Sequence, residues 1–233
     1  MKLKVKWDAF YSQISDYIKE AEGILIVREE LCTIKSYEFI LATTNNWINK
    51  CYTFLRKAFD QPDNVYAERF YSEKPYSFYL DDSELKTRDH LKEVFQNLSI
   101  KKNWLLYNLR LLSVCDVIVR PETIDEKVRE NFGIEQTVDL LFEKLYELND
   151  GSYYPVHAIL RGNGIKLKEN RAFSTLLIKY EAEGNIKLIS NSSICGQLTL
   201  KGKSLLEQSG KHQIKQHSRD AHRSLTKVAI KTN

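Results

Sequence analysis

Glycine is distributed very unevenly along this chain of 233 residues. Of its nine glycines, only Gly23 lies before residue 133, and the other eight follow. Because glycine supplies the backbone conformations of tight turns, the long glycine-poor stretch favours helices over a turn-rich fold. Pro121 precedes the change in composition. The pattern predicts a boundary near residue 130, between a helical part and a part that mixes helices with turns.

Apolar residues recur at three- and four-residue steps within residues 1–130, which predicts a helical domain of unknown role. We expect one helix over 7–23 that stops at Gly23, one over 34–59, and a long one from Ser83–Glu84 to about Cys115, with room for a break at 97–99. The apolar ladder of the second helix includes Phe39, Ile40, Trp47, Cys51, Phe54 and Leu55. Two β-branched runs, Ile24–Val27 and Val114–Val119, favour extended structure.

An aromatic-rich connector is expected between the second and third of these helices. It contains Tyr66, Phe70, Tyr71, Tyr76, Phe78 and Tyr79. Aromatic side chains can stack on nucleic-acid bases, but residues 60–82 hold more acidic than basic side chains, and acids repel phosphate. We therefore expect these rings to pack a core.

The run Trp47–Phe59, followed by Tyr66 and Phe70, resembles helical segments of uncharacterised bacterial anti-phage (abortive-infection) accessory proteins. The resemblance covers a short stretch and carries no chemical signature. Independently of this resemblance, we predict that residues 1–130 form a homodimer or contact a protein partner.

Positive charge is concentrated after residue 210. Residues 1–134 are net −1, residues 135–210 are neutral, and residues 211–233 are net +5, which together give the +4 of the whole chain. The basic side chains of this segment recur every four residues, at Lys211, Lys215, Arg219, Arg223, Lys227 and Lys231. We predict that residues 209–233 form a flexible or amphipathic basic tail that contacts nucleic-acid phosphate, with a membrane surface or an acidic protein as alternatives.

Residues 134–208 show a definite order of elements. A helix with apolar Val138, Leu141 and Leu145 is followed by a short helix over 155–160, a turn at 161–164 and a third helix over 168–183 closed by Gly184. Two β-prone runs, 186–189 and 197–200, can pair across 190–196, and 201–208 is helical. The ending Leu198–Leu206 has the pattern LTxxGxxLL.

This order and this ending resemble the winged helix-turn-helix family. The predicted fold class is accordingly mainly α, with an N-terminal helical domain and a C-terminal winged helix-turn-helix made of three helices, a β-hairpin wing and a closing helix. In that family the threonine of the ending caps the last helix, which here implies that role for Thr199.

The third helix has two unlike faces on a helical wheel. Phe173, Leu176, Leu177 and Tyr180 make the face expected to be buried, and the opposite face carries basic side chains without an acid. Arg171 is suited to guanine, Ser174 and Thr175 to base edges or phosphates, and Ile178 to a thymine methyl group. The candidate DNA-binding residues are Lys168, Arg171, Ser174, Thr175, Ile178 and Lys179, with Arg161 and Lys166 nearby.

Double-stranded DNA is thus the predicted partner, and a transcriptional regulator or a defence-associated DNA-binding factor is the predicted function. The alternative is a non-enzymatic adaptor subunit whose winged helix contacts protein, which an exposed Ile178 would favour. The acids of the domain balance its basic side chains, and the hairpin residues Asn191, Ser192 and Ser193 are uncharged. The two functions therefore remain open at this point.

Catalytic and metal-binding patterns are missing from the sequence. It has no HExxH, no GxSxG and no pair of cysteines at metal-ligand spacing, and the glycines at 162 and 164 lack the spacing of a phosphate loop. His90 is expected at the surface, and His157 in packing or beside a phosphate. We expect no enzyme activity, no cofactor and no metal. The cysteine usage favours the reducing cytoplasm, and no apolar run is long enough for a membrane span.

Overall fold

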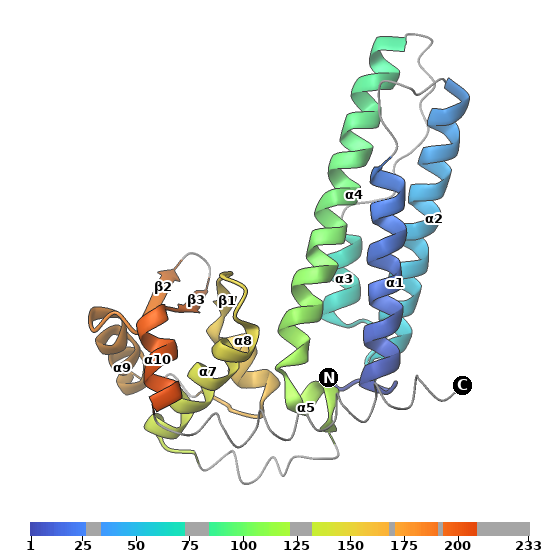
Figure 1. Ribbon diagram of the computed structural model, residues 1–233. Helices are drawn as coiled ribbons and strands as arrows, with labels where there is room; N and C mark the ends of the chain where they lie inside the picture. Colours follow the sequence, from blue (N-terminus) through green and yellow to red (C-terminus); the bar gives the residue numbers. More distant parts are fainter. Residues whose placement is uncertain (27–33, 73–83, 122–131, 168–170, 191–192, 209–233) are drawn as a thin grey trace, which may run out of the picture. The chain divides into compact units, whose positions relative to one another are not determined.

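A computed structural model of the chain (Figure 1) describes residues 1–26, 34–72, 84–121, 132–167, 171–190 and 193–208. The chain divides into two compact units, Met1–Ile124 (unit 1) and Asp125–Asn233 (unit 2). The described parts are mainly helical, with one small antiparallel sheet of three strands. The prediction of a mainly helical chain is confirmed.

Three long helices run side by side in unit 1: α1 (Trp7–Leu25), α2 (Ile34–Ala58) and α4 (Glu84–Ser113) (Figure 1). The shorter α3 (Val65–Tyr71) packs against α2 and α4, and α5 (Asp116–Val119) follows α4. The core between them is built from large side chains that are almost wholly buried, among them Phe10, Trp47 and Leu98. Apolar burial on this scale is the main term that favours folding.

The first helix does not stop where the sequence predicts. Gly23 lies on the exposed side of α1, and the helix continues through Ile24 and Leu25. Ile24 is buried, one turn beyond Ala21 on the same stripe of core residues. The extended run predicted at 24–27 is therefore wrong for Ile24 and Leu25, because tertiary packing outweighs the weak helix propensity of glycine. Val27 lies outside the described residues.

The second helix follows its prediction closely, with one displaced residue. Its buried stripe holds Tyr37, Ile40, Leu41, Thr44, Trp47, Ile48, Cys51, Leu55 and Ala58. Phe39 falls off this stripe and is 72% exposed, so its place in the buried ladder is wrong. Burial raises the pKa of the Cys51 thiol well above its usual value, so that Cys51 behaves as an apolar side chain.

The predicted aromatic connector begins as a helix. Asn64 caps α3, because its Oδ1 accepts from the Ala67 amide at 2.9 Å. Phe70 then packs against Trp47 and Tyr66 against Phe59, with ring centroids 5.8 and 5.1 Å apart. Core packing is thereby confirmed for the described rings, whereas Tyr76, Phe78 and Tyr79 lie outside the described residues.

Residues 2–4 join two distant ends of unit 1. The Leu3 amide donates to the Ile118 carbonyl at 2.9 Å, and the Lys4 amide donates to the Ala58 carbonyl at 2.8 Å. The β-prone run at Val114–Val119, which contains one of these partners, ends in the short helix α5 and does not form a strand. The long helix before it has no break at 97–99.

Unit 2 contains α7 (Ile134–Leu148), β1 (Tyr154–Pro155), α8 (Val156–Gly162), α9 (Arg171–Ala182), β2 (Ile186–Ser190), β3 (Ile194–Leu198) and α10 (Leu200–Gln208). The strand order is β1-β3-β2, with both pairings antiparallel. Ser190 pairs with Ile194, so the hairpin is tighter than the predicted loop over 190–196. The sequence did not predict β1.

The closing helix α10 is fixed by its first turn. Thr199 caps it, because the Gly202 amide donates to Thr199 Oγ1 at 3.1 Å, as the resemblance implied. Thr199 Oγ1 also donates to the Gly184 carbonyl at 2.7 Å, and the Tyr146 hydroxyl of α7 donates to Glu207 at 2.8 Å. That last hydrogen bond raises the pKa of Tyr146.

None of the helices in the described ranges combines the length with the apolarity that a bilayer crossing demands.

Candidate nucleic-acid interface

The two faces of α9 separate as the sequence predicts. Phe173 and Leu177 are buried, and Leu176 and Tyr180 are partly buried. Tyr180 meets Phe142 of α7 edge to face, with ring centroids 5.0 Å apart. These contacts fix the rotation of α9 about its axis, and so decide which side chains point outward.

The outer face of α9 carries Arg171, Thr175, Ile178 and Lys179, and all four side chains are exposed. Thr175 Oγ1 donates to the Arg171 carbonyl at 2.8 Å, one turn earlier. Because its proton is engaged there, this hydroxyl can accept a hydrogen bond from outside. Ile178 is 61% exposed, so its apolar side chain lies on the outer face.

The acids of α9 and of the residue after it are held by contacts to other parts of unit 2. Glu181 Oε1 accepts from the Leu188 amide in β2 at 2.8 Å. Glu183 accepts from Asn185 Nδ2 at 3.1 Å, and its other oxygen lies 3.9 Å from Lys179 Nζ. In the described part of α9, neither acid therefore pairs with Arg171 or Thr175. The positive charge of Lys179 is partly offset by Glu183.

The other predicted site residues fall in different places. Arg161 is exposed in the last turn of α8, and Lys166 is exposed in the segment that follows. Ser174 is partly buried beside a pocket instead of facing outward with Thr175. Lys168 lies outside the described residues, as do the six basic residues of the tail from Lys211 to Lys231.

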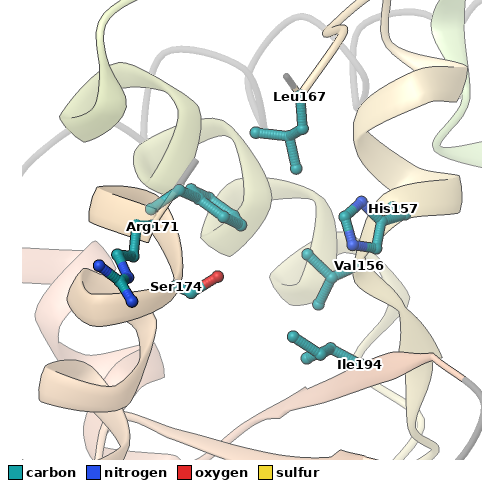
Figure 2. Close-up of a pocket in the computed structure, with 7 residues that line it drawn as sticks. Val156, His157, Leu167, Arg171, Ser174 and Ile194 are labelled. Atoms are coloured by element: carbon teal, nitrogen blue, oxygen red, sulfur yellow. The ribbon is translucent and has the colours of Figure 1, made fainter. Parts of the chain in front are cut away.

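A pocket of about 460 Å³ opens between α8, α9 and β3 (Figure 2). Its lining includes apolar and polar side chains from several elements: Val156, His157, Leu167, Arg171, Phe173, Ser174 and Ile194. Figure 2 shows Ser174 directing its hydroxyl across the space, toward Val156 and Ile194, with the His157 ring also on that far side. Sequence reasoning missed this pocket, since no spacing links residues contributed by a helix start, a helix interior and a strand.

The remaining titratable candidates belong to other surroundings. His90 is partly buried, and its Nδ1 is hydrogen-bonded to the Tyr37 hydroxyl, so the expected surface position is wrong. His157 is exposed at the start of α8 and faces the pocket. Among the described residues, no group of histidines, cysteines and acids is arranged to hold a metal ion.

Comparisons with known proteins give this chain no relative. No protein-family model matches it, and neither the curated proteins nor the solved structures that were searched contain a match.

Proposed function

We propose that residues 134–208 form a winged helix-turn-helix that binds double-stranded DNA through the outer face of α9. The order α7, α8, α9, hairpin and α10 supports the fold, as does the capping of α10 by Thr199. The carrying observation is the outer face of α9, where Arg171, Thr175, Ile178 and Lys179 are exposed and, within the described part of the helix, Glu181 is engaged by the Leu188 amide of β2. A helix of this kind fits the major groove of DNA.

Each outer side chain has a defined role in this proposal. Arg171 donates two hydrogen bonds to a guanine edge, a pairing that the geometry of the guanidinium favours. Thr175 Oγ1, whose proton goes to the Arg171 carbonyl, accepts from an amino group of adenine or cytosine. Ile178 contacts a thymine methyl group, and Lys168 and Lys179 bind phosphates.

The test measures duplex binding at several salt concentrations, with the fluorescence anisotropy of a labelled DNA as the signal. Arg171→Gln should weaken binding to the preferred sequence by about 1–3 kcal/mol. Lys179→Gln and Lys168→Gln should weaken binding to all sequences and reduce the salt slope by about one each. Lys19→Gln removes the same charge from an exposed position in unit 1 and serves as the matched control. Unchanged affinity in all three α9-region variants, with folding intact, would refute the proposal.

A second function is favoured by the exposure of Ile178. An apolar side chain that is 61% exposed in the middle of a helix face is suited to a protein partner, and the adaptor alternative predicts such a contact. Ile178→Lys separates the two functions. It should preserve or strengthen binding to non-specific duplex DNA, because it adds a positive charge facing phosphate, whereas it would destroy an apolar protein contact. In the preferred sequence it removes only the thymine methyl contact. A large loss of affinity for non-specific DNA in this variant would contradict the proposed groove contact.

A further inference from the structure

The pocket beside α9 has the size and lining of a small-molecule site. Its volume of about 460 Å³ lies within the roughly 300–1,000 Å³ that ligand pockets span. Pairing of Pro155 with Cys195 brings Val156, the first residue of α8, and Ile194, the first residue of β3, to one wall. Leu167 and Phe173 complete an apolar surface that would receive the body of a ligand.

The polar groups of the pocket define the head group of that ligand. Ser174 and His157 face the space from opposite sides, and Arg171 also lines it, with its guanidinium directed away from His157 in Figure 2. Arg171 is exposed, and it is the one arginine or lysine among the described residues that line the pocket. None of the described lining residues is acidic. A planar anion is therefore favoured, since a guanidinium pairs with a carboxylate through two parallel hydrogen bonds.

We infer that this pocket binds a small carboxylate with an apolar, ring-sized body, and that the ligand and DNA exclude one another. The second part rests on the proposed function, because Arg171 and Ser174 belong both to the pocket and to the candidate DNA-binding residues. A guanidinium engaged with a carboxylate is not available to a guanine. The coupling is reciprocal, so DNA lowers the affinity for the ligand by the same factor.

The pocket is tested first without DNA, on the full chain with labelled methyl groups. The probe is 1-naphthylacetate, and the matched neutral probe is 1-naphthylacetamide. The carboxylate should shift the NMR signals of Val156, Leu167 and Ile194, while the methyl groups of Ile14 and Ile18 in the core of unit 1 stay unchanged. It should bind about tenfold more tightly than the amide, as expected for a charge-assisted hydrogen bond.

Variants test whether Arg171 pairs with the carboxylate of the probe and whether the probe occupies the pocket. Arg171→Gln should abolish the tenfold preference for the carboxylate, whereas Lys187→Gln, an exposed position on β2, should retain it. Ile194→Trp should fill the pocket and weaken both probes, with the amide spectrum of the sheet reporting that the fold is intact. Absence of shifts at millimolar probe overturns the pocket, and equal binding of the two probes overturns the anionic ligand.

Competition is measured separately, by titrating 1-naphthylacetate into the complex with labelled duplex DNA. The apparent DNA affinity should fall in proportion to the occupancy seen by NMR. If the probe shifts the pocket methyl groups and DNA stays bound, the exclusion is wrong and the pocket stands. If the chain binds no DNA even without the probe, the proposed function fails, and the NMR result still decides the pocket by itself.

Discussion

The two units use opposite means to fix their shapes. Unit 1 is held by large rings, such as Trp47, Phe70 and Trp104, which pack against each other between long helices. Unit 2 depends on the smallest residue at points of close approach. A Cβ at Gly202 would lie 2.1 Å from the Asn185 carbonyl oxygen, and a Cβ at Gly196 would lie 3.0 Å from Ile186. Unit 1 should therefore be sensitive to lost volume, and unit 2 to added volume.

Gly202→Ala should have the largest effect. The carbonyl of Asn185 cannot withdraw easily, because it accepts a hydrogen bond from the Thr199 amide at 3.1 Å. We expect the free energy of unfolding of unit 2 to fall by about 3 kcal/mol. All three tryptophans lie in unit 1, so their fluorescence follows that unit in urea, while circular dichroism follows both units.

The expected result for Gly202→Ala is an early phase in circular dichroism and an unchanged fluorescence midpoint. A fluorescence midpoint that falls with the first phase would mean that the two units unfold together, and the comparison between them would lose its basis.

Asn64→Ala is the corresponding test in unit 1. The side chain accepts from the Ala67 amide and donates to the carbonyls of Leu55 at 3.1 Å and Gln61 at 3.0 Å. Its loss should cost about 2 kcal/mol and lower the fluorescence midpoint. Asn64→Asp keeps the cap but not the donors, so its fluorescence midpoint should lie between those of the wild type and Asn64→Ala. An unchanged midpoint in Asn64→Ala would show that α3 contributes little to unit 1.

Gly23→Ala should have a smaller effect of the opposite sign. A Cβ at this exposed helical position meets nothing within 4 Å, so the substitution should stabilise unit 1 by about 0.5–1 kcal/mol. The same change at Gly184, where φ is +76°, should destabilise unit 2, because alanine is strained in the left-handed region. Equal effects at the two positions would contradict the distinction drawn between the units.

Deletion of residues 211–233 should have the smallest effect on stability. We expect both urea midpoints to stay within error, since the segment has few apolar residues to bury. Binding to DNA should weaken at low salt with little change in sequence preference, because the deletion removes a net charge of +5. A large fall in the melting temperature with unchanged binding would instead identify the tail as a docked structural helix.

Periodic segments were predictable from sequence because one physical term dominates them. The buried stripe of α2 and the Phe173–Leu177 face of α9 follow directly from helical spacing. The run at Val114–Val119 was not predictable, since its β-branched residues favour a strand while its amides bond to carbonyls three or four residues earlier, and its long-range partner is Leu3. Phe39 shows the same limit, because apolar character alone does not say which side of a helix meets the core.

The candidate interface also has one part that the sequence predicts and one part that it does not. The exposure of Arg171, Thr175 and Lys179 could be read from the helical wheel, because a single helix carries all three. The partial burial of Ser174 and the pocket beside it could not, since residues of α8, α9 and β3 meet there only in the folded chain. Residues so far apart in sequence leave no periodic signal.

The hydrogen bond between Leu3 and Ile118 sets an order of events during synthesis. Residues 2–4 leave the ribosome long before their partners, the carbonyls of Ala58 and Ile118. Contacts between residues so far apart in sequence give no stability until the chain between them is available, and they slow folding. Unit 1 therefore closes only when nearly all of its residues have been translated, and the Leu3–Ile118 hydrogen bond forms only then.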